Sequence, residues 1–203
     1  MIVAVISGRG SNLQALLEAG LPVSGVISNR ADAQGLELAA ARGVATRVVE
    51  HQRFPSREAF EAALGAEIDR FAPRLVALAG FMRVLTPGFV ERYAQRMLNI
   101  HPSLLPAFPG LDTHARALAA GVKLHGCTVH FVSAEVDHGP IVIQAAVPVR
   151  AADTAASLAA RVLRQEHVIY PRAVRWFLDG RLVIDNGVVS VKGSDEQVVL
   201  AAV

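Results

Sequence analysis

Strand-like and helix-like segments alternate along the first hundred residues, and this alternation constrains the fold of the chain more than any other feature. Short apolar runs rich in Val and Ile are separated by stretches with apolar residues at helical spacing. Parallel strands joined by helices form a right-handed parallel sheet with helices on both faces. We therefore expect an α/β fold with a mostly parallel, twisted central sheet. The expected strands cover residues 1–7, 23–28, 44–49 and 75–79. A first helix is expected to contain Leu13, Leu16 and Leu17, and two further helices are expected at 36–42 and 56–71.

The regular alternation of strands and helices does not continue in the second half of the chain. A strand is expected at 97–101, and two β-rich runs at 129–132 and 141–149 flank a long hairpin loop, so antiparallel additions are predicted here. A long amphipathic helix is expected over 154–177, with Pro171 as a kink or boundary. A terminal hairpin around Asn186-Gly187 follows. Because no linker or repeat interrupts the pattern, residues 1–203 are predicted to form a single domain.

Composition excludes several classes of protein. The chain has 203 residues, of which 52% are hydrophobic and 19% charged, so an ordered globular protein is expected. No apolar run is long enough for a membrane span, and the N-terminus lacks a signal-peptide pattern. The expected location is therefore the cytoplasm.

Charge and cysteine content narrow the expected ligands. The net charge is only +2 and the arginines are scattered, which fits a small anionic ligand better than a nucleic acid. The single cysteine, Cys127, excludes an internal disulfide and any cysteine-based zinc site. It is expected to act as a small buried hydrophobic residue.

An amide and an imidazole stand two residues apart in the stretch Asn99-Ile100-His101-Pro102-Ser103-Leu104-Leu105-Pro106. In an extended backbone both side chains share one face, and Pro102 keeps His101 out of the helical region. Acyl transfer needs fixed donors for an oxyanion and a group that handles a proton. The alternative interpretation is a turn with an incidental histidine.

A glycine turn stands where the first strand becomes the first helix. Gly8 and Gly10 let a ligand approach the backbone, and the amides that open a helix bind anions. Leu13 replaces the third glycine of the dinucleotide fingerprint, so a single phosphate is favoured at Ser11 and Asn12. The alternative is an ordinary capped helix with a tight turn.

One loop carboxylate is expected to raise the pKa of the His101 imidazole. Asp137 lies between the two β-rich runs, where it could reach His101 at the carboxyl edge of the sheet. A carboxylate near an imidazole favours the charged imidazolium.

These elements together resemble one family. The motifs that match in order are Ser7-Gly8-x-Gly10-Ser11-Asn12, Ser28-Asn29-Arg30-Ala31-Asp32-Ala33, Ala79-Gly80-Phe81-Met82-Arg83, the stretch from Leu98 to Pro106, Pro109-Gly110-Leu111-Asp112-Thr113-His114, and Gln165-Glu166-His167. The chain closely resembles the glycinamide ribonucleotide transformylases of purine synthesis from residue 1 to about residue 180. The resemblance implies a Rossmann-like formyltransferase fold and a cis Leu105-Pro106 bond.

The resemblance also implies an activity, the transfer of a formyl group from 10-formyltetrahydrofolate to the amine of phosphoribosylglycinamide. Asn99, His101 and Asp137 match the catalytic trio. Asn99 and imidazolium His101 would stabilise the oxyanion, and Asp137 would keep His101 charged and help move a proton through a water. The scheme needs no metal.

The same resemblance assigns the binding residues. The ribonucleotide is expected at Gly10, Ser11, Asn12, Arg164, Gln165 and Glu166. The folate is expected at Arg57, Met82, Arg83, Val84, Leu85, Asn99, Ser133, Ala134, Glu135, Val136 and Asp137. Plain core packing is the alternative for Met82, Val84 and Leu85, and His114, His125 and His130 are interpreted as structural or supporting residues.

Three other functions compete with this one. A formyltetrahydrofolate hydrolase uses a similar trio but would not need the phosphate loop. A nicotinamide oxidoreductase is opposed by the missing third glycine and by Ser28-Asn29 where an acidic residue is expected. A non-catalytic sensor is opposed by the presence of all three catalytic residues. The expected partners are small molecules, with neither nucleic acid nor membrane, and the chain is expected to be a monomer or homodimer. Two residues depart from the family pattern. His138 stands beside Asp137, where a small residue is common, and Cys127 stands where a hydroxyl residue is expected.

Overall fold

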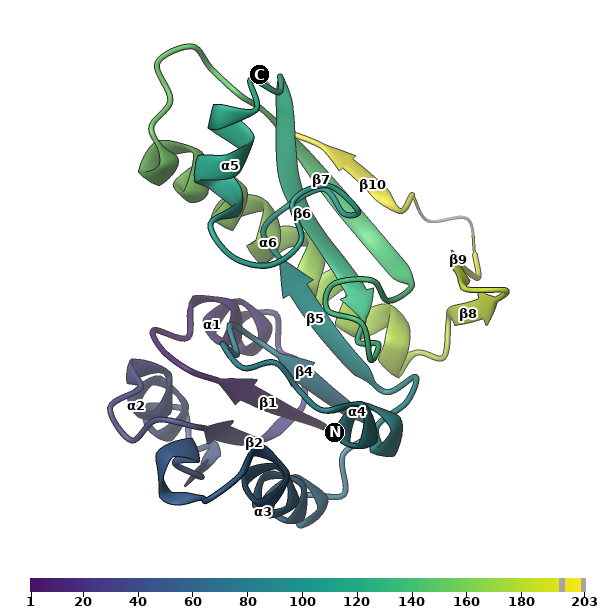
Figure 1. Ribbon diagram of the computed structural model, residues 1–203. Coiled ribbons are helices and arrows are strands. Elements are labelled where there is room, and N and C mark those ends of the chain that lie inside the picture. The colour runs from purple at the N-terminus through teal and green to yellow at the C-terminus, as the bar shows by residue number, and fades with distance from the viewer. Residues whose placement is uncertain (194–195, 202–203) are drawn as a thin grey trace. The chain divides into compact units, whose positions relative to one another are not determined.

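The computed structural model describes residues 1–193 and 196–201, and the chain forms two compact units, Met1–Asn99 and Ile100–Val203 (Figure 1). Within the described ranges, no helix is both long enough and apolar enough to cross a membrane.

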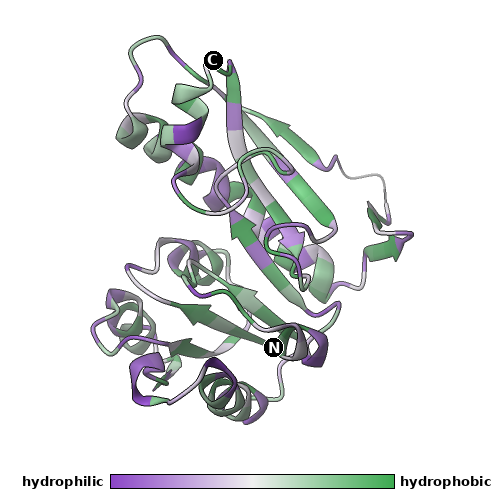
Figure 2. Cartoon of the chain, viewed as in Figure 1, coloured by the Kyte–Doolittle hydropathy of each residue, from purple (hydrophilic) through white to green (hydrophobic). Residues whose placement is uncertain are grey.

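The first unit contains a parallel sheet. Neighbouring strands lie in the order β5-β4-β1-β2-β3, and every pair among them is parallel. All residues of β1 and β4 are buried, as expected for central parallel strands covered on both faces, and Figure 2 shows these strands as hydrophobic. The strands are β1 (Ile2–Ile6), β2 (Val23–Ser28), β3 (Ala45–Val48), β4 (Leu75–Leu78) and β5 (Met97–His101), the last of which ends in the second unit.

Helices connect these strands. Helix α1 packs beside α2, and α3 packs beside α4 (Figure 1). The predicted cap of α3 is confirmed, because the Ser56 hydroxyl accepts a hydrogen bond from the Ala59 amide at 3.1 Å. The short α4 was not predicted, although Thr86 at its N-cap and Pro87 at its first turn signal a helix start. The helices are α1 (Ser11–Glu18), α2 (Gln34–Ala41), the 3-10 turn η1 (His51–Arg53), α3 (Arg57–Asp69) and α4 (Pro87–Arg92).

The second unit is built on an antiparallel pair. Strands β6 (Leu124–Phe131) and β7 (Ile141–Pro148) form the predicted hairpin, and β10 (Val198–Leu200) pairs parallel with β7. Strand β6 begins five residues before the predicted start at Val129, because Leu124 to Thr128 continue the ladder with β7 despite their small and polar side chains. Helix α5 (Thr113–Ala119) and strand β10 were not predicted.

Helix α6 (Ala155–Leu178) packs on β6 and β7. Thr154 caps its N-terminus through the Ser157 amide at 3.2 Å, which matches the predicted start. The prediction of a boundary at Pro171 was wrong: the helix runs through this residue, whose ring is buried with Tyr170 and Ala173. Tertiary burial therefore outweighs the backbone hydrogen bond that proline cannot make.

The predicted terminal hairpin is confirmed. Strands β8 (Leu182–Asp185) and β9 (Val188–Val191) pair antiparallel, and Asn186 and Gly187 between them have φ values of 47° and 79°. Two consecutive left-handed residues are the signature of a type I′ turn, which is why this sequence favours a tight hairpin.

Candidate active site

The glycine turn after β1 lies where the sequence predicts a phosphate site. Gly10 has a φ of 78°, and a side chain there would place its Cβ 2.7 Å from the Gly35 Cα, so neither glycine tolerates a larger residue without movement. Gly10 is the N-cap of α1 and, as a glycine, supplies no side-chain cap. The first amides of a helix have no intrahelical acceptor, so this helix start is suited to bind an anion.

A loop of exposed side chains follows the neighbouring strand β4. Met82 is 64% exposed and Val84 is 52% exposed, which excludes the core-packing alternative for both. Arg83 and Arg57, the first residue of α3, are also exposed. Leu85 is buried, so its side chain packs in the protein rather than facing solvent. Because β1 and β4 are adjacent and parallel, the glycine turn and the Met82 loop emerge at the same edge of the sheet.

Asn99 and His101 lie on β5, as predicted. Asn99 pairs in register with Leu78 of β4 and is half-buried, whereas His101 is buried. Alternation along a strand puts these two side chains on one face. The Leu105-Pro106 peptide bond that follows is cis, as the family resemblance implied.

The structure brings His101 and Asp137 together. The Nδ1 atom of His101 lies 3.4 Å from the Oδ2 atom of Asp137, and its Nε2 atom lies 3.0 Å from the carbonyl oxygen of Phe108. Both ring nitrogens thus face oxygen acceptors. A neutral imidazole has only one N–H, so only the imidazolium satisfies both acceptors. The same Asp137 oxygen accepts a hydrogen bond from the Gly110 amide at 2.8 Å.

Both residues that hold His101 have a left-handed backbone. Phe108 and Asp137 have φ values of 55° and 57°, in the left-handed region that side-chain-bearing residues avoid. Gly139 explains how the Asp137 loop is held, because a Cβ there would lie 1.7 Å from the carbonyl oxygen of Phe131. Strained conformations of this kind cluster at functional sites.

A second histidine reaches Asp137 from β6. His130 is buried, its Nδ1 atom lies 2.9 Å from the Phe131 carbonyl oxygen, and its Nε2 atom lies 3.7 Å from Asp137 Oδ1. Burial lowers the pKa of His130 more than the charge of Asp137 raises it. Asp137 is therefore flanked by two imidazoles, of which the sequence analysis expected His101 to be catalytic and His130 to be structural or supporting.

Another pair of histidines supports the loop that carries Phe108. His125 Nε2 lies 3.2 Å from His114 Nδ1, and the His125 ring meets the edge of Phe108. Burial, and then the charge of His114, lowers the pKa of His125 to about 4. The pKa of His114 is also lowered, chiefly by burial. A buried imidazole at His125 and a half-buried one at His114, both neutral at pH 7, agree with a structural role.

The loop between β6 and β7 exposes three of its five predicted folate residues, Ala134, Glu135 and Val136. The Ser133 hydroxyl donates to the Glu135 carbonyl oxygen at 2.8 Å, so it braces the loop. His138 turns away from Asp137: its Nδ1 atom lies 2.8 Å from the Val136 carbonyl oxygen and its Nε2 atom 3.4 Å from Glu135. This departure from the family pattern thus acts within the loop.

The remaining predicted residues lie on α6. Arg164 is exposed, Gln165 is half-buried and Glu166 is buried. Cys127 on β6 is fully buried, as predicted, and burial together with the nearby charge of Glu166 raises the pKa of its thiol. Cys127 therefore fills space beneath this region as an unreactive side chain.

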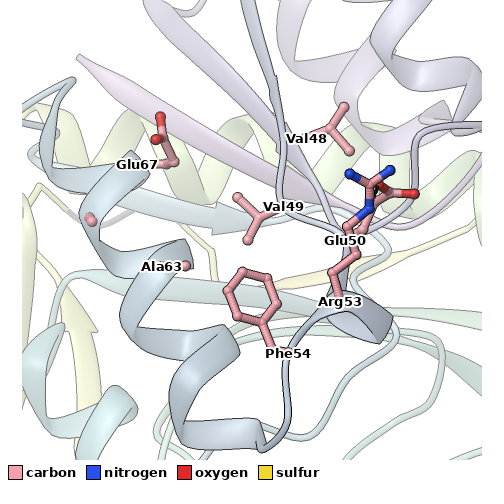
Figure 3. Close-up of a pocket in the computed structure, with 8 residues that line it drawn as sticks. Val48, Val49, Glu50, Arg53, Phe54, Ala63 and Glu67 are labelled. Carbon is pink, nitrogen blue, oxygen red and sulfur yellow. Dashed lines mark ion pairs between the residues drawn. The ribbon is translucent and has the colours of Figure 1, made fainter.

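A cavity of about 370 Å³ lies elsewhere in the first unit. Figure 3 shows Phe54 beside Val49 and Ala63 at its apolar end, while Glu50 and Arg53 form an ion pair at the other end. Its lining consists of residues outside the predicted site. In the two described ranges, no group of three or more His, Cys, Asp or Glu side chains is arranged to hold a metal ion.

Comparison with known proteins decides the family. Residues 1–174 match the sequence profile of the formyl transferase family. The chain belongs to this family. The phosphoribosylglycinamide formyltransferase of Escherichia coli strain K12 is 51% identical to this formyltransferase over 198 residues, covering 95% of this chain and 93% of the relative.

Solved structures of formyltransferases share the fold. The phosphoribosylglycinamide formyltransferase of Coxiella burnetii, in complex with CHES, matches with a TM-score of 0.92 and 45% identity, covering 98% of this chain and 97% of that chain. A formyltetrahydrofolate deformylase from Pseudomonas syringae pv. tomato matches with a TM-score of 0.86 but only 27% identity, covering 94% and 65%. The predicted α/β formyltransferase fold is confirmed, and the deformylase is the more distant relative.

Sequence reasoning missed the groups that hold His101 and Asp137. Phe108 and Gly110 act through a backbone carbonyl and a backbone amide, which no side-chain pattern reveals. Thr128 was missed too: its hydroxyl donates to Ser103 O at 2.7 Å and accepts from the Leu105 amide at 3.0 Å, which fastens the proline loop to β6. Thr128 lies outside the predicted strand at 129–132, so no pattern in the sequence indicated this role.

Proposed function

We propose that this formyltransferase moves the formyl group of 10-formyltetrahydrofolate to the amine of phosphoribosylglycinamide, in the synthesis of purines. The observation that carries the proposal is the imidazole of His101, held between Asp137 and the Phe108 carbonyl and two residues from Asn99 on β5. Similarity to phosphoribosylglycinamide formyltransferases along nearly the whole chain supports the choice of substrates.

In the proposed reaction the amine of the ribonucleotide attacks the formyl carbon, and the carbonyl oxygen becomes an oxyanion. The Asn99 amide donates a hydrogen bond to this oxygen, and the positive charge of His101 stabilises it. The new carbon–nitrogen bond forms, the bond from the carbon to the folate nitrogen breaks, and one proton passes from the amine to that nitrogen. Asp137 assists this transfer through a water.

The geometry supports His101 as a fixed charge rather than a proton donor. Both of its N–H groups already face acceptors of the protein, Asp137 Oδ2 and Phe108 O. Donation of a proton to substrate would require one of these contacts to be given up. We therefore assign the electrostatic role to His101 and the proton-handling role to Asp137.

The proposed substrate positions are those that the family resemblance assigns. The ribonucleotide phosphate is proposed to bind the amides and side chains of Gly10, Ser11 and Asn12, where α1 begins without a side-chain cap. The remaining ribonucleotide contacts are proposed for Arg164, Gln165 and Glu166. The folate is proposed to contact Arg57, Met82, Arg83, Val84, Leu85, Asn99, Ser133, Ala134, Glu135, Val136 and Asp137.

The proposed acting species is a single formyltransferase domain, monomeric or homodimeric, in the cytoplasm. Its partners are small molecules and the scheme uses no metal. The alternative activity is hydrolysis of 10-formyltetrahydrofolate, in which water replaces the amine as the nucleophile.

A steady-state assay separates the two activities. Release of tetrahydrofolate should depend strictly on phosphoribosylglycinamide, with one formylated ribonucleotide formed for each tetrahydrofolate released. Equal folate turnover without the ribonucleotide would support the hydrolase and reject the transferase.

A further inference from the structure

The motif Ser28-Asn29-Arg30-Ala31-Asp32-Ala33 has no part in the proposed reaction, yet its second residue belongs to a buried chain of polar groups. Ser7 at the end of β1 and Asn29 at the end of β2 are 7% and 3% exposed. The Ser7 hydroxyl lies 2.6 Å from the Asn29 side-chain oxygen. Buried polar groups in such contact are costly to disrupt, because each lost partner leaves an unsatisfied group.

These buried hydrogen bonds run in one direction, which starts at the Met82 loop. The backbone amide of Met82 donates to the Ser7 hydroxyl oxygen at 2.9 Å, and a backbone amide can only donate. The single Ser7 hydroxyl proton is then donated to Asn29 Oδ1. The Ser7 backbone joins the same loop, since its amide donates to the Gly80 carbonyl oxygen at 3.2 Å.

The orientation of Asn29 follows from that direction. Because Oδ1 faces Ser7, the Nδ2 group faces the next neighbour, His51 Nδ1, at 3.1 Å. The same His51 Nδ1 atom lies 3.2 Å from the Asn29 backbone carbonyl oxygen, so the ring contacts both the side chain and the backbone of Asn29. The ring of His51 is itself held against the edge of Phe60 from α3. The series of hydrogen-bonded groups therefore runs from Met82 through Ser7 and Asn29 to His51.

The opposite end of the loop has an independent anchor. Glu61 of α3 is 3% exposed and accepts hydrogen bonds from the Thr86 amide, at 2.8 Å, and from the Thr86 hydroxyl. The backbone is thus fixed at Gly80, Met82 and Thr86, while the side chain of Met82 remains 64% exposed. A rigid backbone with an exposed apolar side chain is suited to contact a flat ligand without a large ordering cost.

We infer that Ser7 and Asn29, supported by His51, are positioning residues that hold the Met82 backbone for the folate co-substrate. The inference rests on the proposed function, because it needs folate at Met82. It assigns a task to two residues outside the proposed catalytic and substrate-binding residues.

Ser7→Ala tests the inference, with Ser24→Ala as the matched control. Ser24 on β2 likewise donates a hydrogen bond from its hydroxyl across this strand pair, but to the backbone carbonyl oxygen of Ile2 at the other end, at 3.1 Å. Ser7→Ala should raise the Kd for a non-reactive folate analogue and the KM for 10-formyltetrahydrofolate about tenfold. The KM for the ribonucleotide should stay within about twofold, and Ser24→Ala should change neither.

Asn29 provides a second test that lies farther from the phosphate loop in the sequence. Asn29→Ala removes the acceptor of Ser7 and should reproduce the selective rise in folate KM. Asn29→Asp keeps an oxygen facing Ser7 and should restore folate KM to within about threefold of wild type.

Three outcomes overturn the inference: unchanged folate binding in folded Ser7→Ala protein, an equal rise in both KM values, or no rescue by Asn29→Asp. Failure of the proposed function has a different signature, because wild-type protein would then neither bind the folate analogue nor form formylated ribonucleotide.

Discussion

Two loops carry much of the proposed site, and the protein holds them by different means. The loop after β4 is anchored by backbone amides that donate hydrogen bonds to Ser7 and Glu61, and it leaves Met82 exposed. The loop between β6 and β7 buries its key side chain instead, since Asp137 is one-tenth exposed and lies against two histidines. The first loop is built to present side chains, and the second to fix a charge. Substitutions in the first should therefore act on substrate binding, and substitutions in the second on the rate.

The largest expected effect is that of Asp137→Asn. Asparagine tolerates the left-handed backbone at this position, so the change removes the charge while keeping the conformation. The value of kcat should fall about 100-fold or more, because proton handling and the partner of His101 are both lost. Ribonucleotide binding, measured by calorimetry, should stay close to wild type.

Asp179→Asn at the end of α6 is the matched control and should retain full activity. An Asp137→Asn enzyme with wild-type kcat would remove the proposed mechanism and the distinction between the loops.

Gly139→Ala tests how the second loop is held. A Cβ would lie 1.7 Å from Phe131 O, so the loop must shift and carry Asp137 with it. The free energy of unfolding should fall by about 1–3 kcal/mol, as for other overpacked sites, and kcat should fall as well. Urea unfolding and steady-state assays measure the two effects.

Gly88→Ala in α4 is the control, because no atom lies within 4 Å of a Cβ built there. Wild-type kcat in Gly139→Ala protein would show that the position of this loop does not limit catalysis.

Met82→Ala tests the first loop. Because the side chain is mostly exposed, its loss should leave the free energy of unfolding nearly unchanged. Its contact with bound folate would be lost, and folate KM should rise about threefold to tenfold with little change in kcat. A drop in kcat with constant KM would contradict the assignment of this loop to binding.

The smallest expected effect concerns acid. Burial lowers the pKa of His125 from 6.5 to about 4, so the unfolded chain binds this proton at higher pH than the folded chain. The contribution of neutral His125 to stability is complete above pH 6.5 and is lost as the pH falls toward 4. Urea unfolding across this range should show a shallower decline in His125→Gln protein than in wild type. Identical slopes would mean that this imidazole titrates alike in both states.

Local signals predicted much of the fold. The strand at 97–101, the cap at Ser56 and the turn at Asn186-Gly187 all appear in the structure as expected, since each depends on neighbouring residues. Features decided by tertiary contact were missed. The uninterrupted helix at Pro171 and the early start of β6 depend on burial and on a partner strand.

The same distinction between local signals and tertiary contacts applies to the candidate site. The sequence pointed to His101 and Asp137, and the structure places them 3.4 Å apart. The contacts of Phe108 and Gly110 could not be predicted, because they are made by backbone atoms of a loop whose path depends on the rest of the unit. The bonds between Ser7, Asn29 and His51 were likewise hidden, since they join residues 22 positions apart twice in succession.

Cys127 has a practical consequence for measuring these loops. It is the one cysteine of the chain, it is fully buried, and its thiolate is disfavoured. Thiol-directed dyes and spin labels will therefore leave the native protein unmodified under mild conditions. A cysteine introduced at an exposed position such as Val136 or Val84 would take up the label alone, so the movement of either loop can be followed by spectroscopy without first rebuilding the core.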